Sequence, residues 1–119
     1  IKEQENEQEL DWQNWYDEET FTINAEKVVF NEEKAVFYLI NETEGTATSV
    51  YAAHHENSKY KDSTPHGIRL ANALCRLIKL TGEVEATSMI EGINTVIEEK
   101  GHIVVSVAKT DKGVLWTCA

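Results

Sequence analysis

Apolar residues recur at every second position in the first half of the chain, which is the pattern of β-strands. Phe21 and Ile23 alternate with polar residues, and residues 46–53 alternate in the same way. The apolar segments 28–30 and 35–40 flank a polar stretch of the kind that closes a hairpin. Because residues 35–40 are apolar at every position, we expect a central strand there that is covered on both faces.

The spacing then lengthens to three and four, which predicts two amphipathic helices at about 65–81 and 88–100. The first begins at a proline, a residue favoured in the first helical turn. In the second, Ser88 and Glu91 have the spacing of a capping box, and Gly101 is a natural stop.

Residues 102–109 and 114–118 return to strand spacing and form a final hairpin, in which Gly113 supplies the turn. The predicted order is therefore β-β-β-α-α-β-β. It favours an α+β fold with a mainly antiparallel sheet of about five strands and both helices packed on one of its faces.

The 119 residues suffice for one domain with its own core. The net charge of −10 is uneven, since residues 1–19 carry −7 and residues 20–119 carry −3. We therefore expect a partly flexible acidic leader at 1–18 and a single globular domain at 19–119. Lys and Arg are too scattered for a nucleic-acid partner, and no apolar run is long enough for a transmembrane segment. A removed leader, a lipid anchor upstream of Ile1 or a trimmed sequence would each explain the start without methionine.

The leader ends in an aromatic cluster. Trp12, Trp15 and Tyr16 have i, i+3, i+4 spacing, so one helical turn would place all three rings on one face. The turn could dock on the domain, or it could anchor a protein partner, because Trp and Tyr dominate interface hot spots. We expect the contact surface to combine this cluster with the polar loop 54–64, whose candidate contact residues are His54, His55 and Tyr60.

No catalytic motif stands out. There is no Gly-x-Ser-x-Gly elbow and no glycine-rich phosphate loop, and the leucines around Cys75 would raise the pKa of its thiol. His54, His55 and His66 lack metal-ligand spacing. We therefore expect no catalytic residue, no metal ligand and no cofactor, although a small hydrolase that uses this histidine-bearing loop is an alternative.

The two cysteines decide the expected compartment. Cys75 lies at the border between the apolar and polar faces of the first helix, and Cys118 is the penultimate residue. Cys75 therefore suits either a disulfide with Cys118 or a role as an inert buried thiol. A disulfide would indicate an oxidising compartment, and two free thiols would indicate the cytosol.

The basic side chains of the domain are densest on the polar face of the first helix, at Arg69, Arg76 and Lys79, with Asn72 between them. This stripe is the solvent face of the helix, or it receives the acidic leader or an acidic partner.

Residues 65–118 resemble small lipoproteins of Gram-negative envelopes, and in outline the disulfide-bearing pilotins of type II secretion systems. The shared pattern is a helix bearing Cys75, a helix ending at Gly101, a strand, an Asp-x-Gly turn at 111–113 and a strand closing on Cys118. The resemblance implies a Cys75–Cys118 disulfide and a non-catalytic role in binding a helical segment of a secretin subunit.

Together these features predict a small extracytoplasmic, periplasmic or secreted, protein-binding module that is not an enzyme. It would act as a pilotin-like escort or as an immunity or inhibitor protein, and its acidity suits a basic partner such as a toxin or a secretion component. The alternatives are a cytosolic acidic protein of phage or regulatory type with reduced thiols, and the small hydrolase.

Overall fold

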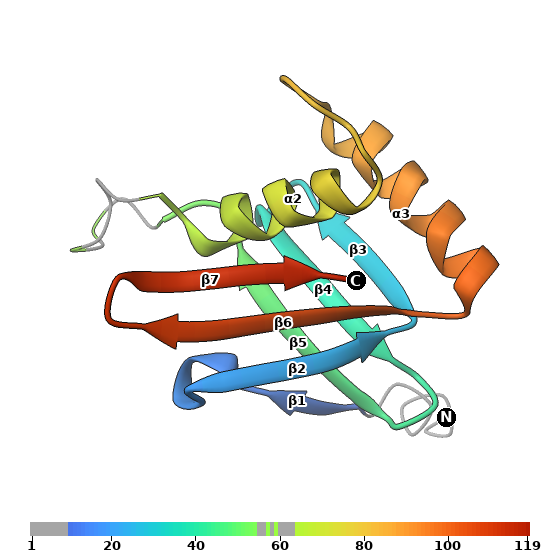
Figure 1. The fold of residues 1–119 in the computed structure, drawn as a ribbon. Helices are drawn as coiled ribbons and strands as arrows, with labels where there is room; N and C mark the ends of the chain where they lie inside the picture. The colour runs from blue at the N-terminus through green and yellow to red at the C-terminus, as the bar shows by residue number, and fades with distance from the viewer. Residues whose placement is uncertain (1–9, 55–56, 58, 60–63) are drawn as a thin grey trace.

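The computed structural model describes residues 10–54, 57, 59 and 64–119 (Figure 1). This part of the chain has an α+β fold with seven strands in two sheets and two α-helices. The strands of sheet A, in spatial order, are β1 (Asp11–Gln13), β5 (Thr46–Tyr51), β4 (Val36–Asn41) and β3 (Lys27–Asn31). Those of sheet B are β2 (Thr20–Ala25), β6 (Ile103–Thr110) and β7 (Gly113–Cys118). The helices are α2 (His66–Leu77) and α3 (Ala86–Lys100), and a short 3-10 helix, η1 (Trp15–Asp17), follows β1.

The α+β class is confirmed, whereas the single sheet of about five strands is wrong. The chain changes sheet at Glu26, which is the one residue between β2 and β3 and whose N–H bonds to the carbonyl of Ile40 in β4. Sheet A is mixed, because β1 pairs with β5 in parallel while its other pairs are antiparallel. Sheet B is antiparallel throughout.

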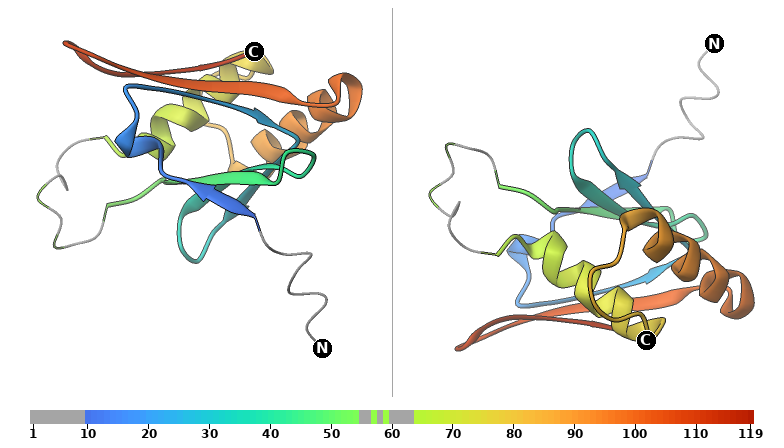
Figure 2. Two further views of the ribbon diagram at one scale, coloured as in Figure 1. Left: turned by 90° about the horizontal axis from the view of Figure 1, so that it is seen from below. Right: turned by 90° about the horizontal axis from the view of Figure 1, so that it is seen from above.

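The core lies between the two sheets, and the helices close the space between them (Figures 1 and 2). Helix α2 packs against β5 and β7, and α3 packs against β3 and β6. Each helix thus contacts one strand of each sheet, which differs from the prediction of both helices on one face of one sheet. The apolar side chains that meet in the core include Val28, Leu39, Val50, Ile23, Val105, Val107, Leu70, Leu74, Met89 and Ile93.

Both predicted helices exist, with shifted ends. Helix α2 stops at Leu77, because Lys79 adopts a left-handed φ of 60° and the N–H of Leu80 returns to the carbonyl of Cys75. Helix α3 starts at Ala86, before the expected capping box, and ends at Gly101 as predicted, where φ is +90°.

Two predicted hairpins are confirmed, β3–β4 and β6–β7. In the first, the side-chain oxygen of Asn31 accepts a hydrogen bond from the N–H of Lys34 and holds the turn. Strand β4 lies between β3 and β5 and is central, as expected. Its two faces differ, however, because Tyr38 and Ile40 on one face are only half-buried.

The aromatic cluster belongs to the folded unit. Trp12 lies in β1, and Trp15 is 1% exposed in the core. A single helical turn with all three rings on one face is therefore wrong, since a strand and a 3-10 helix share the segment. The structure thus places 11–17, which the sequence assigned to the leader, against the sheets. No helix in the described part of the chain is long and apolar enough to cross a membrane.

Candidate protein-binding site

The outer face of sheet A, turned away from the core, is mainly apolar. Strand registers place residue pairs on a common face: Tyr38 with Ser49, Ile40 with Ala47, and Ala47 with Trp12. The same alternation adds further residues, and we call the whole set the aromatic face: Trp12, Val29, Val36, Tyr38, Ile40, Ala47, Ser49 and Tyr51. Val36 and Ala47 are fully buried, but none of these side chains belongs to the apolar cluster between the sheets.

Three rings dominate the aromatic face. Trp12 is 51% exposed and Tyr51 is 54% exposed, whereas Tyr38 is half-buried. The rings of Trp12 and Tyr38 meet edge to face at 5.8 Å, although a whole strand, β5, separates β1 from β4. Since the intervening β5 positions are Ala47 and Ser49, their short side chains leave room for the rings to touch.

Such a face is unusual on a protein surface. Antiparallel sheets commonly present polar residues on the side away from the core. Here the polar residues on the outer face are Ser49 and two residues of the edge strand β3, Lys27 and Asn31, which share the face by register. Contiguous exposed apolar patches mark interaction sites, and Trp and Tyr contribute most to such sites.

Acidic turns border the aromatic face at both ends of its strands. Glu32 and Glu33 are exposed in the β3–β4 turn, and Glu42 and Glu44 are exposed in the β4–β5 turn, with Lys34 the one base among them. The second turn is braced because the N–H of Glu44 bonds to the Asn41 side chain and Thr43 donates to the carboxylate of Glu26. The hydrogen bonds from Thr43 hold the pKa of the Glu26 carboxyl below its usual value. The apolar surface is thus flanked by fixed negative charge.

A second aromatic group lies where η1 meets the start of α2. Trp15 stacks on Tyr16 at 3.9 Å and meets His66 and Trp116 edge to face at 4.9 and 5.1 Å. Its indole N–H donates to the carbonyl of Ser49 at 3.1 Å, which ties η1 to β5. Lys109 donates through Nζ to the carbonyl of Tyr16 from the other sheet.

Tyr16 connects this group to the aromatic face. Its ring is 51% exposed. Partial burial raises the pKa of its hydroxyl, and the nearby Tyr51 raises it further. Burial lowers the pKa of the adjacent His66, and the charges of Arg69, His54 and Lys109 add to that effect.

The predicted contact residues therefore differ in their exposure. Trp12 and Tyr16 are exposed, whereas Trp15 is a buried support for them. His54 lies close enough to influence His66. His55 and Tyr60 lie outside the described residues.

The expected disulfide is not present. Cys75 and Cys118 are both free thiols. They lie in different surroundings, Cys75 beside Phe30, Phe37 and Val84, and Cys118 beside Ala73 and Arg76. Burial raises the pKa of both thiols, that of Cys118 to about 11. The cysteines are therefore protonated at neutral pH, and the structure gives no support for an oxidising compartment.

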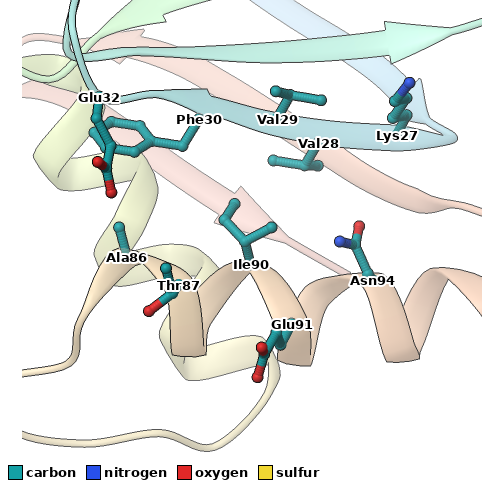
Figure 3. A pocket seen from close by; sticks show the side chains of 10 residues that line it. All are labelled: Lys27, Val28, Val29, Phe30, Glu32, Ala86, Thr87, Ile90, Glu91 and Asn94. Carbon is teal, nitrogen blue, oxygen red and sulfur yellow. The ribbon is translucent and has the colours of Figure 1, made fainter.

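A groove of about 350 Å³ separates the edge strand β3 from α3 (Figure 3). Its floor is apolar, and Figure 3 shows Ile90 pointing from α3 toward Val28. Charges of both signs stand along its walls, at Lys27, Glu32 and Glu91.

In the described part of the chain, no three His, Cys, Asp or Glu side chains lie close enough together to bind one metal ion.

Comparison of the chain with protein-family models, with curated proteins and with solved structures found no match. The pilotin-like resemblance thus stays a prediction.

Sequence patterns missed half of the aromatic face. Tyr38 and Ile40 belong to a continuous apolar run, a pattern that predicts a strand buried on both faces. The signal that could have found them is the pair Ala47 and Ser49, two small residues at the facing positions of the next strand.

Proposed function

We propose that this chain is a non-catalytic protein-binding module that holds its partner on the aromatic face. The observation that carries the proposal is the exposure of Trp12 and Tyr51 on an apolar sheet face that no described helix covers. Rigid sheet positions suit this role, because little conformational entropy is lost when such rings are covered.

The partner that fits is a protein with an apolar patch flanked by basic groups. Its basic groups would meet the glutamates of the two turns, Glu32, Glu33, Glu42 and Glu44. The net charge of −10 would speed the capture of such a partner. A membrane fits less well, since anionic lipid would repel this rim.

Of the two kinds of binding protein considered, these charges favour an immunity or inhibitor protein over a pilotin-like escort. The pilotin-like form was tied to a Cys75–Cys118 disulfide, and both thiols are free. Binding through the aromatic face requires no disulfide, so this proposal holds in an oxidising or a reducing compartment.

The test uses a photo-crosslinking amino acid placed singly at residue 12, 51 or 24 of the full chain in its host. Asn24 is the control, because it is exposed but lies in β2 of sheet B. We expect one protein to crosslink from positions 12 and 51 and not from 24.

The purified partner then permits a quantitative check by calorimetric titration. Trp12→Ser and Tyr51→Ser should each weaken binding about tenfold or more, as truncation of a hot-spot ring does. Asn24→Ser should leave the affinity unchanged. Equal losses in all three variants, or a crosslink only from residue 24, would refute the proposed face.

A further inference from the structure

A second surface, formed by α2 and β7, has the opposite charge. Residues 64–82 and 112–119 contain no Asp or Glu, in a chain that has 21 acidic residues. Helix α2 and strand β7 lie side by side in the fold (Figure 1). The two acid-free segments thus form one continuous strip, which carries Arg69 and Arg76.

The strip is hollowed along its length. Arg69, Asn72 and Arg76 face Leu115 and Trp116 across a hollow of about 160 Å³. A second hollow of about 350 Å³ continues toward Cys118 and shares Arg76 and Trp116 with the first. We call the two together the α2–β7 groove.

Residues that line the groove carry hydrogen-bond donors that are not fully used. Trp116 is 3% exposed, and its indole N–H is buried with no acceptor among the described residues. Arg69 donates to the carbonyl of Val114 at 3.4 Å, a long contact that leaves most of its N–H groups available. In the described part of the chain, no carboxylate pairs with Arg69 or Arg76.

Strand β7 also has backbone N–H groups that face away from its partner strand β6. Val104 and Ala119 exchange both backbone hydrogen bonds, each at 2.9 Å. Hydrogen-bonded pairs alternate along an antiparallel ladder, so Trp116 and Cys118 direct their N–H groups away from β6. The contact from Arg69 to Val114 agrees with this alternation, because Val114 also faces outward.

We propose that the α2–β7 groove binds a carboxylate-bearing, acidic segment of a partner protein. Arginine forks and N–H groups match carboxylate oxygens, and the exposed Leu115 adds an apolar contact beside them. The chain's own residues 1–9 are acidic, but the strand that follows them, β1, belongs to sheet A, whereas β7 belongs to sheet B. A partner's segment is therefore the occupant that the charges and the fold favour, and this site is independent of the aromatic face.

The probe is a synthetic peptide with the sequence of residues 1–9, which has Glu at alternate positions, and the control peptide has Gln at those four positions. Binding is followed by the indole N–H signals of the full chain in ¹H–¹⁵N spectra, which Trp→Phe variants assign. We expect the Trp116 signal to move with the Glu peptide and not with the Gln peptide, while the Trp12 signal stays fixed.

Variants locate the contact. Arg76→Gln should weaken binding of the Glu peptide about tenfold, the usual loss for a charge-assisted hydrogen bond. Lys79→Gln is the control, since Lys79 is exposed just beyond α2 and does not line the groove.

Three results would overturn the proposal: equal effects of the two peptides, equal losses in Arg76→Gln and Lys79→Gln, or the same shift with inorganic phosphate. A fourth is a moved Trp116 signal in the full chain with Glu3, Glu5, Glu7 and Glu9 all changed to Gln. That outcome would mean that the chain's own segment occupies the groove.

Discussion

Gly67 controls how closely α2 approaches sheet A, and its replacement by alanine tests the packing of the whole fold. Gly67 is buried in the first turn of α2. A Cβ atom there would lie 2.6 Å from Cα and N of Ala52 and 2.6 Å from the carbonyl oxygen of Tyr51. All three contacts are with backbone atoms of the chain that leaves β5, which cannot rotate away.

The expected cost follows from this geometry. Carbon atoms pack best at about 3.5–4.0 Å, so a contact of 2.6 Å forces α2 to move off β5 by about an ångström. Overpacking of this kind costs about 1–3 kcal/mol, and the higher helix propensity of alanine returns about 1 kcal/mol at most. We expect Gly67→Ala to lower the free energy of unfolding by about 2 kcal/mol, out of a typical total of roughly 5–15 kcal/mol.

Gly92→Ala is the matched control. A Cβ at Gly92 would lie 2.6 Å from Cδ1 of Ile78, the end of a flexible side chain, and 3.6 Å from the next carbon. Ile78 can change rotamer, so the gain in helix propensity of about 1 kcal/mol offsets most of the overlap. Urea unfolding followed by tryptophan fluorescence measures both variants. Equal stabilities, or a more stable Gly67→Ala, would refute the close approach of α2 to β5.

Three further predictions concern single groups. Trp15→Phe keeps a buried ring but removes the donor to the Ser49 carbonyl, so the free energy of unfolding should fall by about 1–3 kcal/mol; no loss in urea unfolding would contradict that hydrogen bond. Thiol titration in denaturant without reductant should find both Cys75 and Cys118 free, and a result of none would restore the disulfide. The folded state lowers the pKa of His66 below its ordinary value of 6.5, so the stability it contributes is present above about pH 6.5 and is lost as the pH falls below that value. His66→Gln should flatten unfolding free energy against pH in that range, and an unchanged pH profile would contradict the burial of His66.

Local features of the fold were predictable because neighbouring residues determine them. The 3.6-residue period and Gly101 locate α3 to within a few residues. Polar turns between apolar runs likewise identify the hairpins. The division into two sheets was not predictable, because a single residue, Glu26, separates β2 from β3 and the apolar spacing hardly changes there.

The candidate site was half predictable for a related reason. Composition alone marks Trp12 and Tyr16 as contact residues, since both stand in a polar segment. Tyr38 and Tyr51 become visible only when the register of β1, β4 and β5 is known. Parallel pairing of β1 with residues 35 positions later leaves no local trace in the sequence.

Hydroxyl-radical footprinting of the partner complex tests the central claim most directly, because it reports the solvent exposure of each ring. Partner binding should suppress the oxidation of Trp12 and Tyr51 severalfold relative to the free chain. Undiminished oxidation of Trp12 and Tyr51 in a saturated complex would show that the partner binds elsewhere.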